Sequence, residues 1–236
     1  MLAFCNTVPA AVTGEADHRI GNNLAMLASL IRLHAREVAR RERSLSPAEV
    51  ARLLHELCAK VETVARLHRA LALAGTDRVP IATYVRELCD TVASLSPSTQ
   101  TSVSTACEQD VAGARALPVG FIVAEMMANA IKYAHPTGIP VLLNVTCTQA
   151  GDTSICIEVS HDGIGLPERF DPSTDGGLGF RLMRALAQQV GAELDFTSSP
   201  LGTTCRLVLP PEPELNASVS LLHDRTPQIH LEAVGS

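Results

Sequence analysis

There is no tryptophan in this chain of 236 residues and no excess of basic residues, since the net charge at pH 7 is −6. That charge gives no electrostatic footprint for nucleic acid, so direct DNA or RNA binding is excluded. No uninterrupted apolar run reaches the roughly 20 residues that a membrane-spanning helix needs. The amino terminus, M-L-A-F-C-N-T-V-P-A-A-V, lacks the basic start of a signal peptide. We therefore expect a cytoplasmic protein with no membrane span.

The cysteines point to a reducing compartment. There are seven of them, an odd number, and none forms a C-x-x-C pair. Most fall in apolar helix or strand patterns, where a thiol is usually buried. Apolar residues make up 46% of the chain, enough for the cores of one or two domains.

Two glycine clusters form the most informative motif. Residues 162–179 read D-G-I-G-L-P-E-R-F-D-P-S-T-D-G-G-L-G. Glycine allows backbone to approach a ligand closely, and a glycine-rich turn that enters a helix offers free N–H groups to phosphate. The spacing matches neither G-x-x-x-x-G-K-[ST] nor G-x-G-x-x-G, which disfavours the two commonest nucleotide folds. Because such strings also make ordinary turns, the nucleotide interpretation depends on a second motif.

The second motif is E-M-M-A-N-A-I-K-Y-A, in an apolar run from Leu117 to Ala134 with an expected helix start at Pro118. Glu125, Asn129 and Lys132 are spaced at i, i+4 and i+7, which places them on one helical face. A carboxylate and an amide are oxygen ligands that suit Mg²⁺. The alternative is a solvated polar stripe, but the run is otherwise apolar on nearly every face, and buried polar groups need partners. Together the motifs favour an ATP pocket.

The amino-terminal part predicts a helical hairpin. Apolar residues, with His68 at one position of the second pattern, recur at steps of four or three in two patterns. They are Ile20, Leu24, Leu27, Ile31, Ala35 and Val38, then Val50, Leu54, Leu57, Val61, Val64, His68 and Leu71. Between the patterns, Ser46 and Glu49 form a capping box around Pro47. Two helices bury little alone, so we expect a homodimer with a four-helix bundle.

These motifs resemble those of bacterial sensor histidine kinases. The segment D-H-R-I-G-N-N-L resembles the phosphoacceptor motif H-R-x-x-N-N-L of a subgroup related to the HWE group. The matching residues are His18, Arg19, Asn22, Asn23 and Leu24. From Ile81 to Pro210, the downstream elements resemble the N box and glycine boxes of the ATPase fold shared by histidine kinases, gyrase, Hsp90 chaperones and MutL. Two departures are Gly21, where relatives often have lysine, and the missing W-x-E feature that names the HWE group.

The resemblance implies that His18 is phosphorylated from Mg·ATP and that the phosphoryl group then passes to an aspartate of a response-regulator receiver. Glu15 or Asp17 would orient the His18 ring, and Asn22, one turn later, is placed to position a water for the reverse phosphatase reaction. The resemblance also implies a pocket in which Asn129 and Glu125 serve the metal and Asp162 accepts from the adenine amino group. The other expected pocket residues are Lys132, Tyr133, Gly163, Gly165, Gly177, Leu178 and Gly179.

The expected fold class is α+β, with a helical hairpin at residues 1–76, an α/β sandwich with a mixed sheet at 77–210 and a flexible tail at 211–236. Strands are expected at residues 101–107, 141–148, 154–160, 192–197 and 203–209, and helices at 81–95, 118–134 and 178–190. Residues 75–80 are expected to be a linker. His161 is interpreted as a strand end rather than a pocket residue.

Other functions remain open at this stage. Only seventeen residues precede His18, too few for a sensor domain, so we expect either that input arrives from a separate partner or that the protein is not a sensor. A histidine phosphotransferase with a relic ATPase-like domain is the main alternative. A serine kinase of the anti-sigma type and an ATP-driven conformational protein share the pocket, but neither needs the hairpin with its histidine motif. A binding-only module is the remaining alternative.

Overall fold

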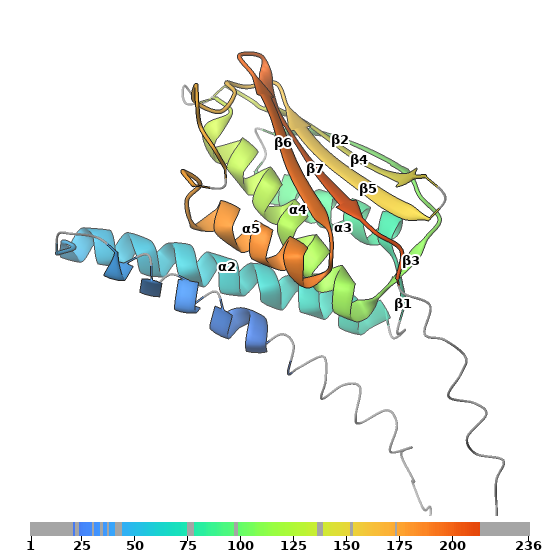
Figure 1. The fold of residues 1–236 in the computed structure, drawn as a ribbon, viewed down its shortest axis with the longest axis horizontal. Helices are drawn as coiled ribbons and strands as arrows, with labels where there is room; N and C mark the ends of the chain where they lie inside the picture. Colours follow the sequence, from blue (N-terminus) through green and yellow to red (C-terminus); the bar gives the residue numbers. More distant parts are fainter. Residues whose placement is uncertain are drawn as a thin grey trace, which may run out of the picture.

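The computed structural model describes residues 21, 24–29, 31–33, 35–36, 38–40, 44–74, 78–96, 99–135, 139–151, 153–172 and 174–212. The four residues expected to act in phosphotransfer, Glu15, Asp17, His18 and Asn22, lie outside these ranges. Within them the fold is α+β, as predicted. Helices come first, and a five-stranded sheet with its own helical layer follows (Figure 1).

The second helix of the hairpin is α2 (Pro47–Ala74), and it starts as the sequence predicts. The Glu49 carboxylate accepts from the Ser46 N–H at 2.9 Å, and the Ser46 hydroxyl oxygen accepts from the Glu49 N–H at 3.3 Å. This reciprocal pair satisfies two N–H groups that no helical carbonyl can reach. The predicted capping box is therefore confirmed.

The apolar seam of α2 is buried at one end and exposed at the other. Val64 and Leu71 belong to the main core, together with Met26 from the preceding helical segment. Val50 and Leu54, near the start of α2, are 41% and 56% exposed. A single copy of the chain therefore leaves apolar surface uncovered at this end of the hairpin.

The central sheet is mixed, as predicted. Its strands, in spatial order, are β2 (Gln100–Ala106), β4 (Leu142–Ala150), β5 (Ser154–His161), β7 (Gly202–Leu209) and β6 (Glu193–Ser199). Strands β2 and β4 are parallel and the other neighbours are antiparallel. Alternate side chains such as Leu143, Val145 and Cys147 are buried on one face, as the two-residue period of a strand requires.

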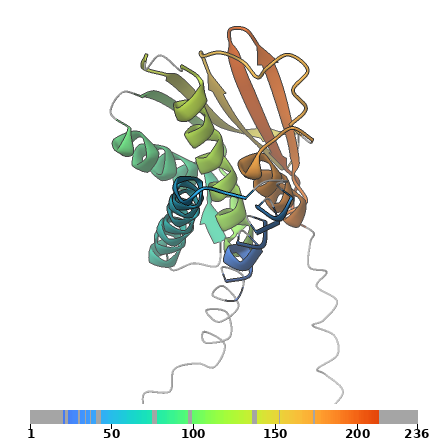
Figure 2. The ribbon, with the colours of Figure 1, turned by 90° about the vertical axis from the view of Figure 1, so that its left-hand side faces the viewer.

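Three helices cover that face of the sheet: α3 (Ile81–Leu95), α4 (Gly113–Tyr133) and α5 (Leu178–Gln189) (Figure 1). Figure 2 shows α2 nearly end-on, on the side of α4 that faces away from the sheet. Helix α4 is therefore packed between the sheet and the hairpin. Side chains on α4 can meet α2 as well as the rest of the domain.

The expected start of α4 at Pro118 is wrong, because the helix begins five residues earlier, at Gly113, and Pro118 lies inside it. Packing explains the difference: Ala116 and Leu117 are 0% and 5% exposed, so the first turn is held by its burial despite the missing proline N–H. Contrary to the expectation from sequence, α4 is long and apolar enough to span a membrane. Within the 18-residue apolar stretch of α4 that gives this result, 72% is buried inside the protein, as in the core helix of a globular domain.

The expected linker contains a short strand that the sequence did not indicate. Strand β1 (Arg78–Pro80) pairs antiparallel with β3 (Asp110–Ala112), which was not predicted either. Three residues are too few to show an alternating pattern, so neither strand could be recognised by periodicity. The pair joins the end of the hairpin segment to the start of α4.

Glu212 fixes this strand pair to the end of the sheet. Its carboxylate accepts from Arg78 Nη1 at 2.7 Å and from the Ala112 N–H at 2.6 Å. Arg115 Nη1 lies 4.0 Å from the same carboxylate, and Arg115 Nη2 donates to the Pro210 carbonyl at 2.8 Å. We call these contacts of Glu212 the clamp. Although residue 212 falls in the expected tail, it is bonded to the domain.

The cysteines follow the predicted pattern with one exception. Of the six described cysteines, all are free and five are buried, and only Cys58 on α2 is exposed. Burial raises the pKa of Cys147 to about 12, with Cys107 adding to the effect, and burial likewise raises the pKa of Cys89 to about 12. Burial therefore keeps the Cys89 and Cys147 thiols protonated and unreactive at neutral pH.

Tyr84 on α3 packs against α4 at Gly120. A Cβ at Gly120 would collide with the Tyr84 ring and hydroxyl, so only glycine allows this approach. The Tyr84 hydroxyl is buried and finds no hydrogen-bond partner among the described residues. Burial raises the pKa of the phenol well above its usual value. The Tyr84 ring therefore stabilises the fold by packing, whereas its hydroxyl loses its hydration on folding without gaining a hydrogen bond from a described residue in return.

Tyr84→Phe is expected to leave the free energy of unfolding unchanged or to raise it by about 1 kcal/mol, because it removes an unpaired buried hydroxyl and keeps the ring. Gly120→Ala is expected to lower it by about 1–3 kcal/mol through overpacking. Urea denaturation followed by circular dichroism measures both. A clear loss of stability in Tyr84→Phe would show that the hydroxyl has a partner.

Glu212→Gln tests the clamp through its pH dependence. Partial burial acts to raise the pKa of Glu212, but the Ala112 N–H, Arg78 and Arg115 outweigh it, so the folded-state pKa lies below its usual value. The stability from the charge is then fully present above the unfolded-state pKa of about 4.3 and is lost as the pH falls through the lower folded-state value. Wild type should therefore exceed Glu212→Gln in urea midpoint at pH 7, and the two should converge near pH 3.

The control is Glu193→Gln, which removes a carboxylate from an exposed position on β6. Its difference from wild type should be small at every pH, since exposed charges contribute little. A difference for Glu212→Gln that does not change with pH would contradict a charge-based clamp.

Candidate functional site

A cavity of about 830 Å³ lies between α4, the start of α5, the ends of the sheet strands and α2. This volume is within the usual range for small-molecule and cofactor sites. Of the expected pocket residues, the structure brings together Glu125, Asn129, Lys132, Tyr133, Gly165, Gly177, Leu178 and Gly179. Both glycine clusters and the polar face of α4 therefore contribute to one cavity.

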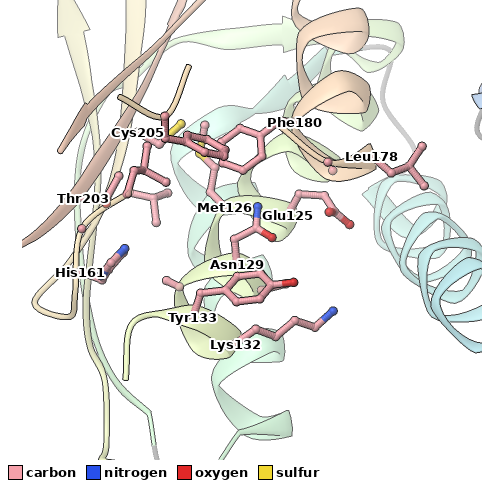
Figure 3. A pocket seen from close by; sticks show the side chains of 18 of the residues that line it. Glu125, Met126, Asn129, Lys132, Tyr133, His161, Leu178, Phe180, Thr203 and Cys205 are labelled. Atoms are coloured by element: carbon pink, nitrogen blue, oxygen red, sulfur yellow. The ribbon is translucent and has the colours of Figure 1, made fainter. Parts of the chain in front are cut away.

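Helix α4 contributes the polar wall. Glu125, Asn129 and Lys132 line the cavity at the predicted spacing of i, i+4 and i+7, with Tyr133 beside them (Figure 3). Glu125 is 8% exposed, the only buried polar or charged residue in the described part of the chain. A buried carboxylate requires a compensating charge or donor. Its surroundings therefore determine what the site can bind.

The second glycine cluster brings the start of α5 against this wall. Gly177 precedes α5, and a Cβ at Gly179 would lie 3.0 Å from Glu125 Oε2 and 3.8 Å from Asn129 Nδ2. Glycine at this position leaves room between α5 and the two polar side chains. The Arg181 N–H donates to the Gly177 carbonyl, whereas the N–H groups that precede it in the first turn of α5 have no helical carbonyl to accept from them. Such a helix start binds anions such as phosphate.

Asp162 follows β5 directly, and its carboxylate is held by two donors. Asp162 Oδ1 accepts from the Leu142 N–H at 2.9 Å and lies 3.1 Å from His135 Nε2. The Leu142 N–H is the main reason why the pKa of Asp162 lies below its usual value, and His135 contributes in the same direction. Asp162 does not line the cavity itself, although the flanking His161 and Ile164 do.

The first glycine cluster is needed where backbones approach each other. A Cβ at Gly163 would collide with the Ala134 carbonyl, and one at Gly165 with the Ser199 carbonyl. These glycines therefore pack the loop after β5 against α4 and β6. Gly165 lines the cavity, whereas Gly163 does not.

His161 is the last residue of β5, as interpreted from sequence, but it also lines the cavity, so the exclusion of a pocket role is corrected. Burial lowers the pKa of His161. The ring is therefore neutral at pH 7, which suits His161 Nδ1 as acceptor for the Gly163 N–H at 3.2 Å. Its side chain faces the cavity opposite Asn129 and Tyr133 (Figure 3).

The side of the cavity formed by α2 was not predicted from the sequence. Glu56, Lys60 and Thr63, spaced at i, i+4 and i+7, line the cavity. The ammonium of Lys60 lies 2.5 Å from Glu125 Oε1. The polar spacing on α2 could have been read from the sequence, but nothing there connects it with a residue 65 positions later. The cavity is thus shared between the hairpin and the domain that follows.

Apolar residues complete the cavity. Phe180 on α5 stacks at a tilt with Phe170 at 5.5 Å and with Phe196 at 5.1 Å between ring centroids. Phe170 and Phe180 line the cavity together with Met126. These side chains provide an apolar surface of the kind that binds a planar base. The sequence reading centred on polar and glycine residues and did not identify them.

The donor set fits a magnesium nucleotide. Glu125 and Asn129 offer oxygen atoms next to a helix start that suits phosphate. Among the described residues, no group of three or more His, Cys, Asp or Glu side chains could hold a metal by itself. This suits Mg²⁺, which takes few protein ligands and completes its shell with water and phosphates.

Family comparisons agree with this geometry. Residues 15–96 match the family described as "Histidine kinase", and residues 115–213 match the "Histidine kinase-, DNA gyrase B-, and HSP90-like ATPase" family. The "Blue-light-activated histidine kinase 2" of Erythrobacter litoralis (strain HTCC2594) is 26% identical over 202 residues, which are 83% of this chain and 56% of that protein. The "Sensor histidine kinase PdtaS" of Mycobacterium tuberculosis is 30% identical over 192 residues, which are 78% of this chain and 35% of that protein.

The chain thus spans between about a third and somewhat more than half of these curated relatives. Among solved structures, the Erythrobacter litoralis EL346 blue-light activated histidine kinase superposes with a TM-score of 0.66 at 23% identity, covering 89% of this chain and 62% of that one. Its separate histidine kinase domain gives a TM-score of 0.58 at 23% identity and covers 78% of this chain and 95% of that one. These structures show the same fold.

The two family matches follow each other along the chain, and residues from both matched regions line the cavity. The region matched to the ATPase family contains the α4 wall, both glycine clusters and Asp162. The region matched to the histidine kinase family contains His18 and α2. This chain belongs to the histidine kinases of the two-component type, with an ATP-binding domain of the kind shared with gyrase and Hsp90.

Proposed function

We propose that this chain phosphorylates itself on His18 from Mg·ATP and passes the phosphoryl group to an aspartate of a response-regulator receiver. The observation that supports this most is the meeting of Glu125, Asn129 and the start of α5 at one end of a nucleotide-sized cavity. The same chain carries the H-R-x-x-N-N segment at residues 18–23.

Different residues of the cavity bind different parts of the nucleotide. The N–H groups at the start of α5 and the Lys132 ammonium bind the phosphates. Asn129 and Glu125 would hold Mg²⁺, which would supply charge neutralisation for the phosphates when bound. Asp162 lies next to the cavity-lining His161 and is oriented by the Leu142 N–H, and it would accept from the adenine amino group once the nucleotide is bound. The apolar side chains around Phe180 would pack against the base.

Phosphotransfer requires an unprotonated nitrogen of His18 in line with the γ-phosphate. The carboxylate of Glu15 or Asp17 holds the other ring N–H and fixes the tautomer. Asn22, four residues after His18 in the sequence, positions the water in the reverse phosphatase reaction. The protonation state of the His18 imidazole therefore determines whether the ring can act as the nucleophile.

The active unit is a homodimer. Leu24 and Ile31 of the first helical segment are 60% and 51% exposed, and Val50 and Leu54 of α2 are exposed as well. Exposed apolar side chains at the spacing of a helical seam are normally covered by a second helix pair. A second hairpin would bury them and form a four-helix bundle.

The first test is incubation of the purified protein with radiolabelled Mg·ATP, scored for acid-labile, base-stable label. Wild type should be labelled, and His18→Ala should lose the label completely. His55→Ala is the control, because it removes an exposed histidine from α2, where the His55 Nδ1 contacts the Ala51 carbonyl. That variant should retain the wild-type level.

Asp162→Asn should weaken ATP binding about tenfold or more, since a charge-assisted hydrogen bond contributes about 1.5–3 kcal/mol. Calorimetric titration with ATP measures this loss, and the label on His18 should fall with it. Absence of label in wild type, with acceptance of phosphate at His18 from a phosphorylated receiver, would contradict the kinase assignment. It would identify a phosphotransferase instead.

A further inference from the structure

One contact in the cavity links the hairpin with the ATP-binding domain. Lys60 of α2 and Glu125 of α4 form an ion pair with 2.5 Å between Nζ and Oε1. Their side chains are only 15% and 10% exposed, so water screens the pair poorly. The same ammonium lies 6.0 Å from the centre of the Phe121 ring. This is a buried contact between two units rather than a surface pair of little consequence.

The pair satisfies a requirement of Glu125. A carboxylate that is 8% exposed is costly unless an opposite charge or several donors compensate it. The described hydrogen bonds give Glu125 one partner, Lys60, while Glu125 Oε2 faces the open position at Gly179. Figure 3 shows the Glu125 carboxylate turned away from the strands and toward α2. In this state Lys60 provides the positive charge that the carboxylate needs.

A magnesium nucleotide would bring a second cation to the same carboxylate. An ammonium and the hydrated metal cannot both occupy the immediate surroundings of Glu125 without strong mutual repulsion. Lys60 has another acceptor nearby, because Glu56 lies one turn earlier on α2 and also lines the cavity. The ammonium can therefore leave Glu125 without becoming an isolated buried charge.

We propose that the Lys60–Glu125 pair is a latch that holds α2 against the nucleotide-free pocket, and that binding of the magnesium nucleotide opens it. The proposal rests on the ATP-binding function proposed above and adds its coupling to the hairpin. Helix α2 and His18 both fall in the region matched to the histidine kinase family, so release of α2 would free the ATP-binding domain to move relative to that region. Nucleotide binding and movement of the two units thus become one linked equilibrium.

The test compares wild type with Lys60→Met in two measurements. The first is the dissociation constant for Mg²⁺ and a non-hydrolysable ATP analogue, from calorimetry. The second is amide hydrogen exchange of residues 56–63 with and without that ligand. Lys60→Met should bind about threefold to tenfold more tightly, because no latched fraction reduces its apparent affinity. Ligand should speed exchange in wild type, whereas Lys60→Met should exchange fast already without ligand.

Arg66→Met is the matched control, since it removes one positive charge from an exposed position on the same helix outside the cavity. It should behave as wild type in both measurements. Lys60→Gln is measured beside Lys60→Met and should show the same changes, so that a folding defect peculiar to one replacement does not decide the result.

Three outcomes would overturn the latch. Weaker binding by both Lys60 variants would show that Lys60 contacts the nucleotide instead of competing with it. Equal affinity in all variants, with unchanged exchange, would show that the pair only supports the fold. Failure of wild type to bind the analogue would overturn the proposed ATP function itself, and the latch with it, which distinguishes that failure from the other two.

Discussion

The site depends on one constraint, which is that a helix buried on almost every side carries three polar residues in a row along one face. Helix α4 is enclosed by the sheet, by α3 and α5, and by α2, and thirteen of its residues are buried. Glu125, Asn129 and Lys132 can therefore exist only where the packing leaves an opening. The cavity is that opening. The surrounding glycines and the start of α5 keep it narrow enough for side chains on both sides to reach one ligand.

The sequence predicted those parts of the fold in which local chemistry and tertiary packing agree. The five sheet strands show alternating or β-branched patterns of useful length, and the start of α2 has a capping box, so both were recognised. The start of α4 was misplaced because Pro118 is a strong local signal, whereas burial of Ala116 and Leu117 depends on distant partners. Strands β1 and β3 were missed because three residues carry no period.

In the site, too, features with a local sequence signal were predicted, and features that depend on distant partners were not. Spacing along one helix gave the α4 wall, and glycine content gave the loops near α5. The contribution of α2 could not be predicted, because a long-range ion pair leaves no trace in a single sequence. Asp162 follows β5, as expected from its motif. Its hydrogen-bond partners, Leu142 and His135, could be identified only from the three-dimensional structure. The four phosphotransfer residues remain predictions.

The distribution of buried and exposed cysteines has a consequence for experiments that follow the movement of α2 relative to the ATP-binding domain. Five of the six described cysteines are buried, which shields them from alkylating reagents in the native state. The exposed one, Cys58, lies two residues before Lys60 on α2. Within the described part of the chain, the protein thereby offers a single natural attachment point for a spectroscopic reporter, on the helix that borders the nucleotide cavity.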